Sequence, residues 1–119
     1  MTLEEFRHEM ESYRRDADAE AQRLKDPWIA LERLRILYGR FDESERLMAH
    51  QVLGEWLLSE DENLRFDAMA LVRDLRLLSA MPALRELAIR LASSRERGAP
   101  YELDKVSGLI KELTGERPF

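Results

Sequence analysis

The sequence has no cysteine, only five glycines and four prolines, and no long uninterrupted run of apolar residues. Without cysteine, the chain cannot carry a disulfide framework, a thiolate nucleophile or a cysteine-based zinc site. No apolar run approaches the roughly 20 residues that a membrane-spanning helix needs, so we expect no membrane partner. The segment after Met1 has neither the basic nor the apolar region of a signal peptide. These absences favour a cytoplasmic protein.

What the sequence does contain is enough apolar material for one folded domain. Its 119 residues are 45% hydrophobic. A chain of this length buries roughly two-thirds of the surface that it exposes when unfolded. No linker long enough to separate two domains interrupts it. We therefore expect a single domain over residues 1–119.

Negative charge is concentrated in one segment. The formal net charge of the chain is −5, whereas residues 42–67 alone hold eight acidic and two basic side chains, a net charge of −6. A concentrated acidic surface repels nucleic acid and anionic membranes and attracts a basic partner. The alternative is that these acids mostly cap helices and lie in solvated loops.

A short pattern of residues occurs twice in this segment. Each copy has an acidic pair, then an arginine, a small residue and an aliphatic residue. The first copy is Asp42, Glu43, Arg46, Ala49 and Leu53, and the second is Asp61, Glu62, Arg65, Ala68 and Val72. In each copy the acid caps a helix and the small residue lies on the packing face. This repetition is typical of stacked helical repeats, which expose an extended surface to partners.

Start and stop signals along the chain predict six helices and no strand. Each start has a capping side chain or a proline at the first helical position. The predicted starts are Thr2, Pro27, Asp42, Asp61, the run Ser79–Pro82 and Pro100, and the predicted ends include Lys25, Gly39 and Gly115. Short connections between such helices force neighbours to be antiparallel. The sequence therefore predicts an all-α fold of about six antiparallel helices in a right-handed stack, with a compact helical bundle as the alternative.

The apolar stripes of these helices predict the core. Leu24 lies on the stripe of the first helix, Trp28 on that of the second, and Leu47 and Trp56 on that of the third. Core packing is the expected role of both tryptophans, and the alternative is that they anchor an interface. Glu55 is out of phase with the stripe, so we expect it to face solvent or a partner.

Residues 61–87 resemble a HEAT-type repeat. A capped first helix carries Arg65 and Ala68 at the offsets of that family, and a second helix opened by Pro82 follows after a tight turn. Residues 42–53 match the first-helix pattern more weakly, so the two matches fall on consecutive helices instead of alternate ones. The resemblance covers about half the chain and implies a HEAT-like helical stack. Small acidic bacterial proteins that resemble HEAT stacks are often immunity proteins, which bind and block a cognate toxin.

The sequence offers no motif for catalysis or metal binding. His8 and His50 lie on separate predicted helices, in neither an HExxH motif nor an i,i+4 pair, so we expect no metal site. The acidic run 60–62 is typical of a solvated turn, and not of two carboxylates in a pocket that separates their pKa values. There is no GxSxG motif and no glycine cluster that could hold a phosphate. We expect neither an enzyme nor a cofactor.

We therefore predict a protein-binding module, in its most specific form an immunity protein that neutralises a basic toxin domain. Exposed carboxylates would make charge-assisted contacts with the basic partner. The predicted contact residues are Asp42, Glu43, Glu55, Glu60, Asp61 and Glu62.

Two alternatives stay open at this point. One is a helical scaffold that self-associates through exposed Phe6 and Tyr13, so the protein could be a monomer or a homodimer. The other is nucleic-acid binding through a basic region at the fifth helix and the following loop. Interrupting acidic residues and the lack of interleaved aromatics argue against the second. The arginines of that region are Arg85, Arg90, Arg95 and Arg97.

Overall fold

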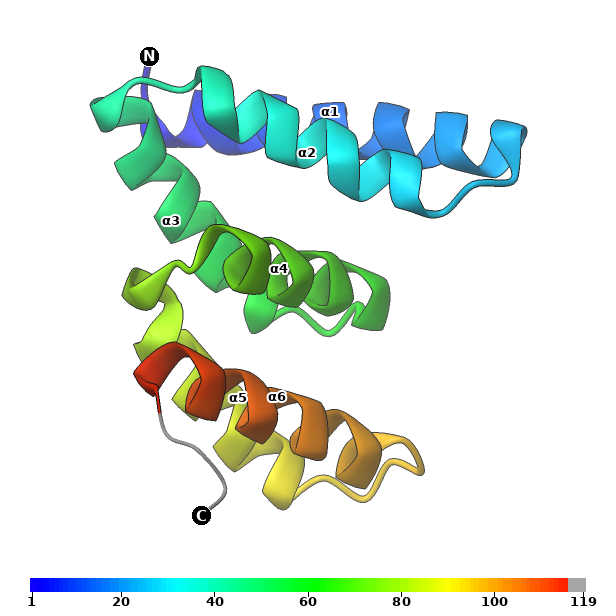
Figure 1. Cartoon of the computed structure of the whole chain (residues 1–119), viewed down its shortest axis with the longest axis vertical. Coiled ribbons are helices and arrows are strands. Elements are labelled where there is room, and N and C mark those ends of the chain that lie inside the picture. Colours follow the sequence, from blue (N-terminus) through cyan, green and yellow to red (C-terminus); the bar gives the residue numbers. More distant parts are fainter. Residues whose placement is uncertain (116–119) are drawn as a thin grey trace. The chain divides into compact units, whose positions relative to one another are not determined.

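The computed structural model describes residues 1–115 of the chain and is all-α (Figure 1). Its elements are α1 (Leu3–Leu24), α2 (Trp28–Arg40), α3 (Glu43–Leu57), α4 (Glu62–Leu75), the short 3₁₀ helix η1 (Leu78–Ala80), α5 (Met81–Ala92) and α6 (Ala99–Thr114). No β-strand occurs in residues 1–115. The predicted all-α fold with six helices is confirmed, and the HEAT-like right-handed stack stays a prediction.

The first two helix starts are those that the sequence predicts. The Thr2 hydroxyl oxygen accepts a hydrogen bond from the Glu5 amide at 3.1 Å and donates one to the Glu5 carboxylate at 3.2 Å. At α2, the Asp26 carboxylate accepts from the Trp28 amide at 3.1 Å, and Pro27 already has helical backbone angles. These bonds satisfy amides that have no partner inside the helix.

The chain divides into two compact units, and the boundary falls inside α3. Unit 1 comprises Met1–Val52 and therefore contains α1, α2 and most of α3. Unit 2 comprises Leu53–Phe119 and contains the end of α3 and all later elements. The single domain over residues 1–119 stays a prediction.

Unit 1 is built on a hairpin of α1 and α2 (Figure 1). Ala17 and Ala21 of α1 form a buried cluster with Ala30 of α2. Such small side chains let two helices approach closely. Polar contacts along the same pair tie the helices together, because Arg33 of α2 donates a hydrogen bond to Glu20 of α1 at 2.6 Å.

Unit 2 contains a second hairpin, formed by α5 and α6, and α4 packs against α6 (Figure 1). Its largest fully buried side chains come from four helices. They are Leu53, Trp56 and Leu57 of α3, Val72 of α4, Leu84 of α5 and Val106 of α6. The last turn of α3 therefore supplies the largest part of this set, and Trp56 is a core residue as the sequence predicts.

Three residues predicted for the core are exposed instead: Leu24, Trp28 and Leu47. Leu24 is the last residue of α1 and Trp28 is the first of α2, so no further helical turn continues beside them. Trp28 retains 67% of its accessible surface. The burial predicted for Leu47 is wrong for another reason. Leu47 lies two residues before the buried Ala49 and so points to the opposite side of α3.

Two helices end at a residue with left-handed backbone angles that is not glycine. Lys25 after α1 has a φ of 55° and Arg76 after α4 has a φ of 51°, whereas α6 ends at Gly115 with a φ of 77°. The left-handed conformation places the Cβ of an ordinary residue close to the carbonyl oxygen that follows, which costs about 1–2 kcal/mol. Glycine avoids this cost and is the residue that usually ends a helix in this way.

We predict that Lys25→Gly raises the free energy of unfolding by about 0.5–1 kcal/mol, part of the gain being offset by the greater freedom of glycine in the unfolded chain. Chemical denaturation followed by circular dichroism measures the change. Lys25→Ala is the matched control, since it removes the charge and keeps the Cβ, and it should give no gain. A glycine variant no more stable than the alanine variant would contradict the prediction.

Candidate functional site

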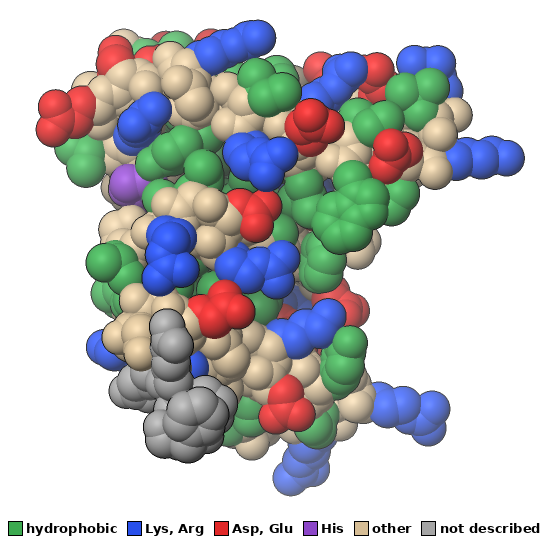
Figure 2. All heavy atoms as spheres, viewed as in Figure 1, with side chains coloured by type: hydrophobic (Ala, Val, Ile, Leu, Met, Phe, Trp, Pro, Cys, Tyr) green, Lys and Arg blue, Asp and Glu red, His purple; other side chains and the backbone are tan. Residues whose placement is uncertain are grey.

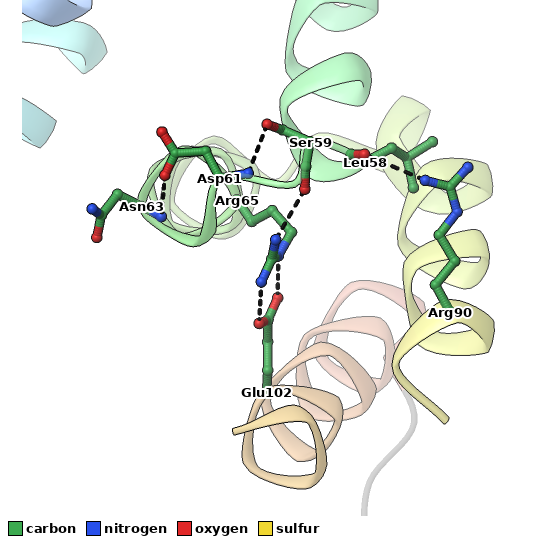
Figure 3. Close-up of polar contacts among 7 residues, drawn as sticks. All are labelled: Leu58, Ser59, Asp61, Asn63, Arg65, Arg90 and Glu102. Atoms are coloured by element: carbon green, nitrogen blue, oxygen red, sulfur yellow. Dashed lines mark hydrogen bonds and ion pairs between the residues drawn. The ribbon is translucent and has the colours of Figure 1, made fainter. Parts of the chain in front are cut away.

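The acidic run at residues 60–62 lies in an ordered turn at the start of α4. The Asp61 carboxylate accepts a hydrogen bond from the Asn63 amide at 2.9 Å, and the Ser59 hydroxyl accepts one from the Asp61 amide at 3.1 Å (Figure 3). Glu60, Asp61 and Glu62 are all exposed. The turn therefore holds three neighbouring carboxylates in solvent, of which Asp61 also serves as the helix cap.

Arg65 of α4 ties this turn to α6. Its guanidinium donates two hydrogen bonds to the Glu102 carboxylate, at 2.7 and 2.8 Å, and a third to the Ser59 carbonyl at 2.9 Å (Figure 3). The Arg65 and Glu102 side chains are only 12% and 14% exposed. These hydrogen bonds with Glu102 raise the pKa of Arg65 above its usual value, so the guanidinium stays charged.

A second arginine also contacts the end of α3. Arg90 of α5 donates to the Leu58 carbonyl at 3.3 Å (Figure 3). It also forms an ion pair with Glu86, one turn away on its own helix, at 3.2 Å. Cations are favourable at the C-terminus of a helix, where carbonyl groups lack partners. Arg90 is thus engaged within unit 2, which weakens the nucleic-acid alternative, although Arg85, Arg95 and Arg97 are exposed.

The start of α3 in unit 1 carries the other copy of the repeat. Asp42 and Glu45 form a reciprocal capping box: the Asp42 carboxylate accepts from the Glu45 amide at 2.8 Å, and the Glu45 carboxylate accepts from the Asp42 amide at 2.9 Å. Glu43 is exposed. Arg46 lies over the ring of Tyr38, with its guanidinium carbon 5.1 Å from the ring centroid.

The arginines of the two repeats therefore have different partners, whereas the small residues behave alike. Ala49 and Ala68 are both completely buried. The caps, Asp42 and Asp61, also play the same part. The repeat thus encodes a capped helix with a close-packed face. The partner of its arginine is a residue outside the repeat, Tyr38 in one case and Glu102 in the other.

An aromatic cluster in unit 1 surrounds one of the two histidines. The Tyr38 hydroxyl lies 2.6 Å from His50 Nε2 and their rings are stacked, while Phe41 packs between Tyr38 and the buried Phe6. Burial, and then the charge of Arg46, lower the pKa of His50 below its usual value of about 6.5. The imidazole is therefore neutral at pH 7, and its tautomer decides whether His50 Nε2 or the Tyr38 hydroxyl donates their hydrogen bond.

The burial of Phe6 corrects one expectation. The scaffold alternative places Phe6 and Tyr13 at an exposed surface of the first helix. Phe6 instead packs against Phe41 with ring centroids 5.0 Å apart, and the half-buried Tyr13 donates a hydrogen bond to the Arg33 carbonyl at 3.4 Å. Both rings are used inside unit 1, so neither supplies the exposed contact that this alternative requires.

All six predicted contact residues are exposed, but they are divided between the two units. Asp42 and Glu43 belong to unit 1, and Glu55 and residues 60–62 belong to unit 2. Of the six, only Glu60, Asp61 and Glu62 are consecutive residues within one unit. A single acidic strip that joins all six residues stays a prediction.

A cluster of exposed rings on unit 2 is not predicted from the sequence. Phe66 of α4 and Tyr101 of α6 are 51% and 68% exposed, and the ammonium of Lys105 lies 5.6 Å and 4.6 Å from their ring centroids. The i,i+4 spacing of Tyr101 and Lys105 is a signal that the sequence offers, but nothing local in the sequence pairs Phe66 with them.

Figure 2 shows basic and acidic side chains alternating over α4 and α6, so the surface drawn there carries charges of both signs.

Two kinds of feature are missing from residues 1–115. This part of the chain has no helix long and apolar enough to cross a membrane and no group of three His, Cys, Asp or Glu residues that could hold a metal ion. Within the same range, the indole N–H of Trp56 is the one fully buried side-chain polar group that lacks a hydrogen-bond partner.

Comparison of the chain with protein families, with curated proteins and with solved structures finds no match.

We predict that Arg65→Met lowers the free energy of unfolding by roughly 2–4 kcal/mol, because it leaves the mostly buried Glu102 carboxylate without its partner. Arg46→Met, at the same position of the other repeat, should cost about 1 kcal/mol or less, since it removes only an exposed cation–π contact. Denaturant unfolding of both variants measures the difference. Equal losses would show that the Arg65 pair is no more than a surface contact.

The neutral state of His50 predicts a dependence of stability on pH. Because the pKa of His50 is lower in the folded chain than in the unfolded chain, the unfolded chain binds the proton more readily. The contribution of His50 is therefore complete above about pH 6.5 and is lost as the pH falls toward the folded value. Thermal unfolding between pH 7.5 and 5 should show a smaller loss for His50→Gln than for the parent chain. His8→Gln, at an exposed position of α1, controls for removal of a histidine as such.

Proposed function

We propose that this chain is a helical-repeat module that binds another protein, and that it acts as an immunity protein that neutralises a basic bacterial toxin domain. The observation that carries the proposal is the exposed acidic turn at the start of α4. Among the described residues, Glu60 and Glu62 form no ion pair, so their charges are available to a partner. The resemblance of residues 61–87 to a HEAT repeat supports the same proposal.

The acidic turn is better suited to binding than to catalysis. Acid–base catalysis needs carboxylates in a site that shifts their pKa values apart, usually by burial. The three carboxylates at 60–62 are exposed, and Asp61 already accepts a hydrogen bond as a helix cap. We therefore propose that the protein acts without a cofactor or a metal, by occupying a surface of its partner.

A basic partner follows from the charge of this segment. Exposed carboxylates attract a positively charged surface over a distance of about one Debye length, 8–10 Å at ordinary salt, and speed association before close contact forms. The basic surface of an enzyme that acts on nucleic acid is the kind of surface that such carboxylates would cover. In this proposal the module competes with the substrate of the toxin in the cytoplasm.

A self-associating scaffold is the second candidate, and a different surface now supports it. Trp28 and Ile36 are both exposed and lie two helical turns apart on α2, and the exposed Leu24 ends the neighbouring helix α1. Tryptophan is the residue most enriched at interface hot spots. Light scattering of the parent chain and of Trp28→Ala tests this candidate, because a dimer that becomes a monomer in the variant would favour it.

The first step of the test is to isolate the partner by pull-down from the source lysate at low and high salt. We then predict that Glu60→Lys with Glu62→Lys slows association with that partner about tenfold or more at low salt and makes the rate less dependent on salt. Asp61 is left in place because it caps α4. Stopped-flow or surface-binding kinetics measure the rates.

The matched control is Glu9→Lys with Asp16→Lys, two exposed positions of α1, which changes the net charge by the same amount. It should slow association much less, because those charges lie outside the acidic segment. If both double variants slow association equally, only the net charge matters and the turn at 60–62 is not the binding site.

A further inference from the structure

Two exposed aromatic rings on unit 2 already hold a cation. The Lys105 ammonium lies 4.6 Å from the centroid of the Tyr101 ring and 5.6 Å from that of Phe66. Both distances are within the range of about 6 Å in which a cation is attracted to an aromatic face. Among the described residues the Lys105 ammonium forms no ion pair, so the rings are its partners.

The rings are held in place by the buried ion pair beside them. Phe66 follows Arg65 directly on α4, and Tyr101 directly precedes Glu102 on α6. The two hydrogen bonds between Arg65 and Glu102 therefore fix the parts of the two helices that carry the rings. The rings themselves keep half or more of their accessible surface, 51% for Phe66 and 68% for Tyr101. Tyrosine is among the residues enriched at the hot spots of protein interfaces.

The charge around the rings favours a basic partner. Glu62 lies one turn before Phe66 on the same face of α4, and Asp104 is adjacent to Lys105 on α6; both are exposed. Glu62 and Glu96 are also close enough to Arg65 to raise its pKa. Arg65 is neutralised by Glu102, so Glu62, four residues before Phe66, and Asp104, three residues after Tyr101, are exposed carboxylates on the helix faces whose rings already attract a cation.

We propose that Phe66 and Tyr101 form the docking site for an arginine side chain of the basic partner, which displaces Lys105 from the two rings. The inference rests on the proposed function, because it locates the partner's anchoring contact beside the acidic turn. A guanidinium suits the site better than an ammonium does, since its plane stacks on aromatic faces and it is less strongly hydrated. Lys105 is in this view an internal competitor that occupies the site in the free protein.

The lysines of the chain make the displacement measurable. There are only three, Lys25, Lys105 and Lys111, so a chain labelled with ¹³C at the lysine ε position gives three signals. Ring currents should shift the Lys105 signal away from the other two in the free chain. Phe66→Leu and Tyr101→Leu should each remove part of that shift. A Lys105 signal that coincides with those of Lys25 and Lys111 would overturn the proposal.

Titration of the full chain with a short oligoarginine peptide tests the docking step. The Lys105 signal should move toward those of Lys25 and Lys111 as the peptide binds. Lys105→Gln should bind the peptide about fivefold more tightly, because the competitor and its charge are gone. Phe66→Leu with Tyr101→Leu should bind it about fivefold more weakly with an unchanged salt dependence. Peptide binding that leaves the Lys105 signal in place would overturn the proposal.

Two further experiments distinguish a failure of the aromatic site from a failure of the proposed function. Glu60→Gln with Glu62→Gln should weaken peptide binding and its salt dependence, and should leave the Lys105 signal of the free chain unchanged. If that variant weakens binding and the ring variant does not, the acidic turn binds the partner and the aromatic site is wrong. If neither variant changes binding, both proposals fail. Single-stranded DNA that displaces Lys105 through the two rings would overturn the choice of a basic protein partner.

Discussion

The guanidinium of Arg65 is the group on which the arrangement of unit 2 depends. It joins three elements, because it belongs to α4, binds Glu102 of α6 twice and caps the chain after α3 through the Ser59 carbonyl. Only a planar fork with several donors can do this, and a lysine ammonium has no matching geometry. Because Phe66 is adjacent to Arg65 in sequence, the same pair also places an exposed ring, so that structural support and the candidate contact surface share one interaction.

The carboxylates of the acidic segment differ in what they contact. Asp42 and Asp61 accept hydrogen bonds from amides at helix starts and so stabilise the fold. Glu43, Glu60 and Glu62 lie in solvent and form no ion pair with another residue in the range 1–115. Helix capping is therefore the observed role of Asp42 and Asp61. In our proposal Glu60 and Glu62, which cap no helix, supply the charges that are available to a partner.

The sequence predicts structural features that depend on residues close together in the chain. It does not predict features that depend on contacts between distant residues. Caps and small buried residues such as Asp61 and Ala68 follow from local chemistry, and the structure confirms them. Trp28 has the spacing of a core residue but lies at a helix end, where exposure depends on what packs beyond it. The ring pair of Phe66 and Tyr101 was not predicted, because α4 and α6 come together through contacts that are far apart in sequence.

The repeat of a cap, an arginine and an alanine separates local information from tertiary information. The cap and the alanine have the same role in both copies. The arginine has an aromatic ring as its partner in one copy and a carboxylate in the other. The same short segment can thus be used at two places in a chain without repeating the surface around it.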